Sequence, residues 1–276
     1  MKSLIIFFIV MVSYHQSGKA QKVFDTVVAK VYYKAYHMYD TIGKISKNEN
    51  MILFVGKNSS VYKSMDKIYN DSLIKDNGPK MQTMDFATNG TRKATFTQIA
   101  KSTNNPNKLL ICENLFRDYL ITEDIQGAMD WQIGSDTKKI ENLDATKATC
   151  FFKGRNYEAW FCTDIPIPNG PWKFGRLPGL ILEVTDITGF VKFNFAGFEN
   201  VQNKNELMPE LPLKAIKISK QDFSNLKEAF RNDPETFMNN AFSDLGNGIS
   251  NVKINTGLPN NRVPNRNNNP IEIEAK

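Results

Sequence analysis

The chain has 276 residues, of which 41% are hydrophobic and 23% are charged, and its formal net charge is +6. This composition is typical of a globular protein, so it excludes a wholly disordered chain and a collagen-like repeat. A chain of 276 residues forms one large domain or two small ones. The only long apolar run lies at the very start, which also excludes a multi-span membrane protein.

The first twenty residues have the pattern of a secretory signal peptide. Lys2 supplies a positive start, and Leu4–Val12 is a nine-residue apolar stretch. Gly18 and Ala20 then place small residues before a predicted cleavage site at Gln21. Nine apolar residues are far fewer than the roughly 20 that span hydrocarbon. We therefore expect an exported protein, with no transmembrane anchor after signal cleavage.

The charge of the mature chain argues against nucleic acid as a partner. Cleavage removes Lys2 and Lys19 and no acidic residue, which lowers the formal charge from +6 to +4. The basic residues are spread along the chain, without a block of five or six like charges. A nucleic-acid binder needs clustered lysines and arginines, so we predict no nucleic-acid partner.

The predicted elements begin with strands. Residues 22–39 are rich in β-branched and aromatic side chains, which favour a strand. Residues 51–55 and 60–65 are predicted to follow as short strands of an antiparallel meander. Residues 66–107 are polar and contain Asn-Gly, Gly-Pro and Asn-Asn-Pro, so they predict loops. The strand pattern resumes over 109–121.

Hairpin signals are stronger after Trp131, which begins a further predicted strand. Residues 148–162 predict a hairpin around a Gly/Asn turn. Residues 180–198 predict the clearest hairpin, because apolar and polar residues alternate along its second arm. Between the two hairpins, Pro166, Pro168 and Pro171 prevent regular strand pairing.

Helical periodicity occurs only late in the chain. Ser219 is a candidate N-cap, and the pattern after it predicts one or two short helices over about 219–245. Residues 255–276 are predicted to be an Asn/Pro-rich mobile tail. Residues 21–254 predict a single, mainly β domain, with antiparallel meander or hairpin strands in a sandwich or half-barrel-like arrangement.

The mature sequence contains no recognisable catalytic motif. His37 is its only histidine, which excludes a multi-histidine metal site and disfavours a Ser-His-Asp triad. The sequence has no G-x-S-x-G, P-loop or G-x-G-x-x-G pattern. We predict no catalytic residues, no metal site and no cofactor. Whether the protein is an enzyme stays open, with a non-enzyme favoured.

The chain contains Cys112, Cys150 and Cys162. In an exported protein an odd number leaves at least one cysteine unpaired. Cys150 and Cys162 flank the predicted hairpin, so we consider a disulfide between them. Buried, inert thiols are the alternative.

Paired carboxylates are the one catalytic arrangement that the sequence leaves open. A glycoside hydrolase needs two acids about 5–9.5 Å apart, whatever their spacing in sequence. Glu158 and Asp164 are a candidate pair. The alternative is that these acids lie on solvated strand edges and turns.

The densest group of aromatic, proline and glycine residues spans 154–182. A Pro/Gly-rich loop between two strong strands follows one path, and aromatic side chains pack around it. The result is either a rigid binding surface or a covered corner of the sheet. The candidate binding residues are Arg155, Trp160, Trp172, Phe174 and Pro178.

Within this stretch lies the motif Gly175-Arg176-Leu177-Pro178-Gly179-Leu180-Ile181. It resembles the motif of the GLPGLI family, exported Bacteroidetes proteins without an established biochemical function, although Arg176 replaces the leading glycine. Further matches are Trp131, Lys147-Ala148, Gly154-Arg155, Ala159-Trp160, Ile165-Pro166-Ile167, Gly170-Pro171 and the ending Asn269-Pro270-Ile271-Glu272.

The resemblance implies a location in the periplasm, with secretion or outer-membrane association as alternatives. Many family members carry a cysteine a few residues before the Lys-Ala pair, where this chain has Ala145, so the resemblance supports no disulfide. We predict a non-enzymatic periplasmic binding or accessory protein. Its partner would be an outer-membrane transport component or a lipid-like or glycan ligand. The alternatives are a carboxylate-dependent glycan hydrolase and a purely structural envelope protein.

Overall fold

The computed structural model describes residues 25–77, 94–202, 205–234, 236–237 and 267–273. The described residues form mainly strands, together with the helices α1 (Met65–Asn77) and α2 (Lys220–Asn232). The strands are β1 (Val27–Asp40), β2 (Ile45–Gly56), β3 (Ser59–Ser64), β4 (Gln98–Ser102), β5 (Asn105–Leu115), β6 (Arg117–Asp124), β7 (Gln132–Ile140), β8 (Leu143–Phe152), β9 (Arg155–Cys162), β10 (Leu180–Asp186), β11 (Val191–Asn200) and β12 (Ile216–Ile218).

These strands form one sheet in the order β12-β6-β5-β4-β3-β2-β1-β11-β10-β9-β8-β7. Neighbouring strands are antiparallel except β12 and β6, which are parallel. The sheet does not close, because β7 and β12 are its two edges. The prediction of a mainly β fold with antiparallel hairpins and a short C-terminal helix is confirmed.

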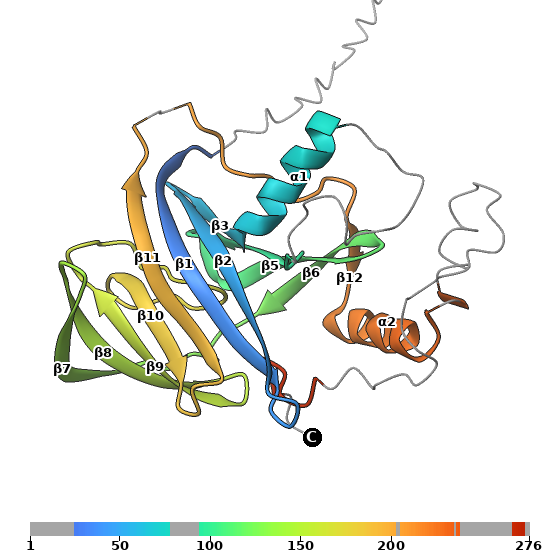
Figure 1. The fold of residues 1–276 in the computed structure, drawn as a ribbon. Coiled ribbons are helices and arrows are strands. Elements are labelled where there is room, and N and C mark those ends of the chain that lie inside the picture. The colour runs from blue at the N-terminus through green and yellow to red at the C-terminus, as the bar shows by residue number, and fades with distance from the viewer. Residues whose placement is uncertain (1–24, 78–93, 203–204, 235, 238–266, 274–276) are drawn as a thin grey trace, which may run out of the picture.

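The long strand β1 joins the two halves of the sheet. Tyr33 pairs with Met51 of β2 on one side and with Phe195 of β11 on the other. Figure 1 shows β7–β10 and β3–β6 on opposite sides of β11, β1 and β2. Because β1 pairs with β11, strands from both ends of the sheet enclose one main hydrophobic core.

Side-chain alternation places every second residue of a strand in this core. In β9, Tyr157, Ala159 and Phe161 are buried, while Asn156 between Arg155 and Tyr157 is exposed. A smaller core on the opposite face of the sheet contacts Ile68 of α1. Burying a large apolar side chain contributes about 1.5–3 kcal/mol, so the alternation strongly favours one register.

Helix α1 lies in the region predicted to be loops. The hydroxyl of Ser64 accepts a hydrogen bond from the Lys67 backbone N–H at 3.2 Å, which caps the first turn. Lys67 also forms an i,i+4 ion pair with Asp71 at 2.8 Å. The helix has no clear apolar stripe, so periodicity could not reveal it.

Helix α2 confirms the predicted C-terminal helix. The Ser219 hydroxyl accepts a hydrogen bond from the Asp222 backbone N–H at 3.0 Å. Phe223 is buried against Tyr119 of β6, with ring centroids 5.4 Å apart. The second short helix predicted within 219–245 falls mostly outside the described residues. Neither described helix is long and apolar enough to cross a membrane.

All three cysteines are buried and unpaired, so the disulfide considered between Cys150 and Cys162 is not formed. Cys150 lies opposite Tyr157, whereas Phe161, the neighbour of Cys162, lies opposite Thr146. The strand register therefore separates the two cysteines along the strands by roughly 16 Å. A disulfide needs Cα atoms within about 7 Å.

Candidate functional site

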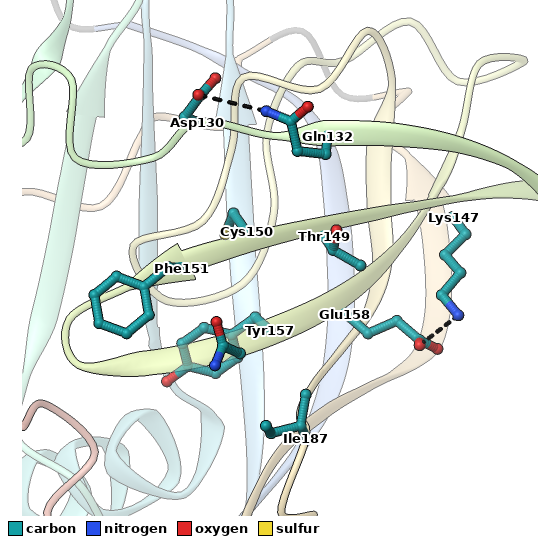
Figure 2. Close-up of a pocket in the computed structure, with 10 residues that line it drawn as sticks. Asp130, Gln132, Lys147, Thr149, Cys150, Phe151, Tyr157, Glu158 and Ile187 are labelled. Atoms are coloured by element: carbon teal, nitrogen blue, oxygen red, sulfur yellow. Dashed lines mark hydrogen bonds and ion pairs between the residues drawn. The ribbon is translucent and has the colours of Figure 1, made fainter.

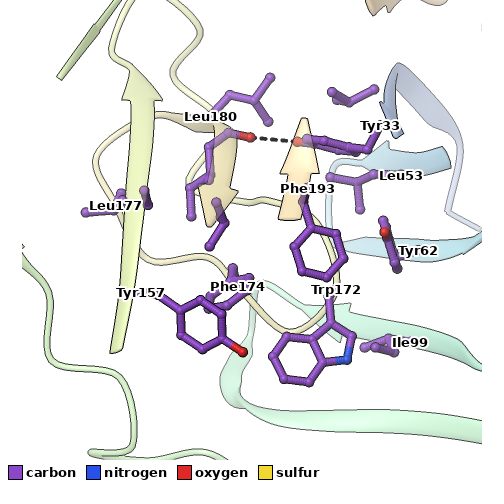
Figure 3. Packing of buried hydrophobic residues seen from close by; sticks show 14 of the residues in the cluster. Tyr33, Leu53, Tyr62, Ile99, Tyr157, Trp172, Phe174, Leu177, Leu180 and Phe193 are labelled. Carbon is purple, nitrogen blue, oxygen red and sulfur yellow. Dashed lines mark hydrogen bonds between the residues drawn. The ribbon is translucent and has the colours of Figure 1, made fainter. Parts of the chain in front are cut away.

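The Pro/Gly-rich segment 163–179 leaves the sheet after β9 and packs into the main core. Trp172 and Phe174 are buried, and their ring centroids lie 5.3 Å apart. Phe174 also contacts Tyr157 at 4.8 Å and Phe193 at 6.1 Å (Figure 3). This segment supplies core side chains that no strand provides.

Polar contacts hold the segment to the opposite half of the sheet. The Lys101 ammonium donates hydrogen bonds to Asn169 Oδ1 at 2.9 Å, to the Gly170 carbonyl at 3.0 Å and to the Phe174 carbonyl. From the other end, Trp131 Nε1 donates to the Gly175 carbonyl at 2.9 Å. These bonds satisfy backbone carbonyls that would otherwise be buried without partners.

Lys101 predicts a pH dependence of stability. Burial lowers the pKa of Lys101 to about 7, against about 10.4 in an unfolded chain. Between these values the unfolded chain binds more protons, so the free energy of unfolding rises with pH. We expect the free energy of unfolding to rise by up to about 1.5 kcal/mol more in the wild type than in Lys101→Met between pH 7 and 8.5. Urea denaturation at each pH measures this difference, and parallel curves for the two proteins would contradict it.

Two positions of the motif have a backbone that favours glycine. A Cβ atom on Gly179 would lie 2.1 Å from the Cys162 carbonyl oxygen, so only glycine fits there. Arg176 has a φ of 71°, in the left-handed region that favours glycine. Its guanidinium donates to Asn107 Oδ1 at 2.6 Å and to the Ile125 carbonyl at 3.0 Å. These contacts oppose the backbone strain at this position.

The five predicted binding residues do not form one surface. Trp172 and Phe174 belong to the core, and Arg155 is buried in an ion pair with Asp186 at 2.8 Å. Trp160 is partly buried on the outer face of the sheet, where the Lys138 ammonium lies 4.4 Å from its ring centroid. Pro178 is exposed. Three of the five therefore have no access to a partner in this structure.

The candidate acid pair does not come together. Glu158 lies on β9, while Asp164 is exposed in the turn after that strand and does not line the hollow that contains Glu158. Lys147 contacts Glu158 at 2.7 Å, and this hydrogen bond lowers the pKa of Glu158. A glycosidase acid needs a raised pKa, so Glu158 lacks that property. Among the described residues, no group of three or more His, Cys, Asp or Glu side chains could hold a metal ion.

A shallow hollow of about 280 Å³ lies on the outer face of the sheet, beside the edge strand β7 (Figure 2). Exposed apolar side chains and polar groups line it together. Phe151 of β8 is 64% exposed and Ile187 of the β10–β11 turn is 73% exposed. The lining residues are Asp130, Gln132, Lys147, Thr149, Cys150, Phe151, Asn156, Tyr157, Glu158 and Ile187.

Of these lining residues, sequence reasoning proposed a site role only for Glu158, as a candidate acid, and for Cys150, as a candidate disulfide partner. Phe151 and Phe152 are adjacent, and the strand register directs Phe152 into the core and Phe151 to solvent. Asn156 of β9 pairs with Phe151, and its side chain also faces solvent. An aromatic residue at a solvent-facing strand position could have indicated this site. Because Phe151 and Phe152 are adjacent, the sequence does not show which of them faces solvent.

The fold belongs to the class of open, mainly antiparallel sheets, with a Pro/Gly-rich loop of the same chain filling the core. A family model described as a protein of unknown function (Porph_ging) matches residues 151–183, which include β9 and the whole of this loop. No protein with a curated description matches the chain.

Solved structures share the fold. Two structures of PNGF-II, in different space groups, each match with a TM-score of 0.50 over 72% of this chain. Their sequences are 14% and 12% identical to this chain over the matched region. The match covers 33% and 32% of those chains, so this protein spans about a third of their length. At this identity the likeness concerns the fold alone.

Proposed function

We propose that this protein is an exported, non-enzymatic binding protein of the cell envelope, and that it binds a glycan at the outer hollow. The observation that carries the proposal is the combination of exposed Phe151 with the polar side chains of Gln132, Thr149 and Asn156 in one hollow. Exposed apolar side chains grouped beside polar ones are typical of binding surfaces.

The chemistry of the hollow suits a sugar ring. The apolar C–H face of a sugar packs on an aromatic ring such as Phe151. The hydroxyls of the sugar form hydrogen bonds with amide, hydroxyl and carboxylate groups. The hollow supplies one of each, from Asn156, Thr149 and Glu158 respectively. Ligand pockets commonly measure about 300–1,000 Å³. A hollow of about 280 Å³ is small by that measure, so it suits one unit of a longer chain.

The Pro/Gly-rich loop has a different role in this proposal. Trp172 and Phe174 act as core residues, which supports a structural role for the motif. The proposal also includes membership of the exported GLPGLI family of Bacteroidetes and a periplasmic location. Its support is the motif at 175–181, the family match at 151–183 and the signal-like start of the chain. N-terminal sequencing of the periplasmic fraction tests the location, and the expected first residue is Gln21.

Isothermal titration calorimetry with oligomers of glucose, mannose and N-acetylglucosamine tests the glycan site. We expect at least one series to bind, and Phe151→Ala and Asn156→Ala to weaken that binding tenfold or more. Ile42→Ala is the matched control, because Ile42 is 74% exposed but lies in the β1–β2 turn and does not line the hollow.

Two results would count against this function. Unchanged binding in Phe151→Ala and Asn156→Ala would remove the hollow as the site. The appearance of shortened oligomers after incubation, detected by chromatography, would favour the hydrolase alternative over a binding protein.

A further inference from the structure

Residues 267–273 lie at one end of the sheet, in a slot where Asn269 is buried, and none of them lines the outer hollow. Figure 1 shows this segment beside the β1–β2 turn. The sequence analysis placed it in a mobile tail, but in the structure its polar groups are bonded at successive positions. Asn268 Oδ1 accepts a hydrogen bond from the Thr41 backbone N–H at 3.0 Å, and Asn268 Nδ2 donates to Asp40 Oδ1 at 2.8 Å.

Asn269 is bonded at both ends of its side chain. Its Nδ2 donates to the Met38 carbonyl at 2.6 Å, and its Oδ1 accepts from the guanidinium of Arg155. Its backbone N–H donates to the Tyr39 carbonyl at 3.1 Å, and its carbonyl accepts from His37 Nε2 at 2.7 Å. Asn269 is only 9% exposed, so a side chain without these groups would leave buried partners unsatisfied.

Arg155 also bonds the two residues that follow. Its guanidinium donates to the Pro270 carbonyl at 2.6 Å and to the Ile271 carbonyl at 3.2 Å. Proline has no backbone N–H, so position 270 presents only an acceptor to the slot. The side chain of Ile271 packs against the main core.

Ion pairs hold the C-terminal end of the segment. Glu272 forms ion pairs with the buried Lys173 and, at 2.9 Å, with Lys220 at the start of α2. Burial opposes ionisation of Glu272, but the lysines outweigh it and keep the pKa of Glu272 below its usual value. The Ile273 backbone N–H donates to the Lys153 carbonyl at 3.0 Å. A Cβ atom on Gly154 would lie 2.4 Å from the Ile273 carbonyl oxygen, so the turn must be glycine for the segment to fit.

The walls of the slot are held by contacts outside the segment. Asp186 anchors Arg155 at 2.8 Å and itself accepts the Val191 backbone N–H at 2.8 Å. Pairing of β1 with β11 ends at His37, so the last residues of β1 leave carbonyls facing the slot. The Asn269 backbone N–H bonds one of these carbonyls, as a peptide does when it adds to a strand.

We propose that this slot is a sequence-specific peptide-binding site for an Asn-Asn-Pro-Ile-Glu-Ile segment, in which residues 268–273 of the same chain are an exchangeable ligand. The specificity comes from Asn269, recognised at both ends of its amide, and from Glu272, recognised by two lysines. Arg155 has its ion pair with Asp186, and Lys173 its ion pair with Glu123, independently of the segment, which allows the same peptide to bind when supplied separately.

The test uses the full-length chain with a site for a specific protease inserted after Arg266. After cleavage, the freed C-terminal piece is removed by dialysis, a fluorescent peptide of residues 267–273 is added, and its anisotropy is measured. We expect the cleaved protein to bind the peptide at least tenfold more tightly than the uncleaved chain, whose slot is already filled. A peptide with Asn269→Leu should bind at least tenfold more weakly. A peptide with Asn267→Ala is the matched control and should bind normally, because Asn267 is exposed.

The proposal is overturned if the cleaved protein keeps its circular dichroism spectrum but binds no peptide, or if the Asn269→Leu peptide binds as well as the wild type. If cleavage unfolds the protein, the uncleaved Asn269→Leu chain provides the test. Its melting temperature should fall, and an excess of the wild-type peptide should raise it again. No recovery would overturn the proposal. None of these results depends on glycan binding at the outer hollow.

Discussion

Phe174→Ala is expected to lower the free energy of unfolding by about 3–5 kcal/mol. Phe174 is fully buried in the segment that fills the core. Its ring contacts those of Trp131, Phe152, Tyr157, Trp172 and Phe193. Removing it leaves a cavity among strands β8, β9 and β11, and close-packed aromatic rings collapse poorly into such a space. Guanidinium denaturation followed by circular dichroism measures the loss.

Phe151→Ala is the matched control for this prediction. The same side chain is removed one residue before the buried Phe152, but Phe151 is 64% exposed. We expect a change within about 0.5 kcal/mol, as for most surface substitutions. If Phe174→Ala cost no more than Phe151→Ala, the loop would not be part of the core, and its aromatic residues would again be candidates for binding.

The second large effect is expected for Arg155→Met, which should cost about 3–5 kcal/mol. The variant leaves the Asp186 carboxylate, 2% exposed, without its positive partner. It also removes the donors to Asn269, Pro270 and Ile271. A buried charge without its partner costs far more than the intact pair contributes. Guanidinium denaturation again provides the measurement.

An exposed ion pair offers the comparison for Arg155. Lys139 contacts Asp144 at 2.9 Å, and their side chains are 68% and 71% exposed. Lys139→Met should therefore change the free energy of unfolding by less than about 1 kcal/mol. The double variant Arg155→Met/Asp186→Asn should recover part of the loss, because the uncompensated charge is gone. Equal costs for Arg155→Met and Lys139→Met would contradict the importance of the buried pair.

Local patterns in the sequence predicted much of the sheet. The hairpin over 180–198 corresponds to β10 and β11, and the one over 148–162 to β8 and β9. The N-cap at Ser219 marked the start of α2. These elements were predictable because alternation, turn residues and caps act within a few residues. Helix α1 was not predictable in this way, since its packing on the sheet stabilises it without a regular apolar stripe.

The candidate sites were less predictable. The sequence identified 154–182 as unusual and named Arg155, Trp172 and Phe174 within it, but burial by distant strands decides that these side chains face inward. The hollow at Phe151 and the slot for 267–273 each combine residues far apart in sequence. No local pattern marks such combinations.

The sequence by itself determined that this is a strand-rich chain with a signal-like start, a Pro/Gly-rich aromatic loop and one late helix with a clear cap. Only the tertiary structure decided that β1 pairs with β11, that the loop fills the core, and that 267–273 binds beside Arg155. The physical reason is the distance along the chain over which each effect acts. Backbone preferences and alternation depend on neighbouring residues, whereas strand order, burial and the partners of buried charges depend on contacts between segments far apart in the chain.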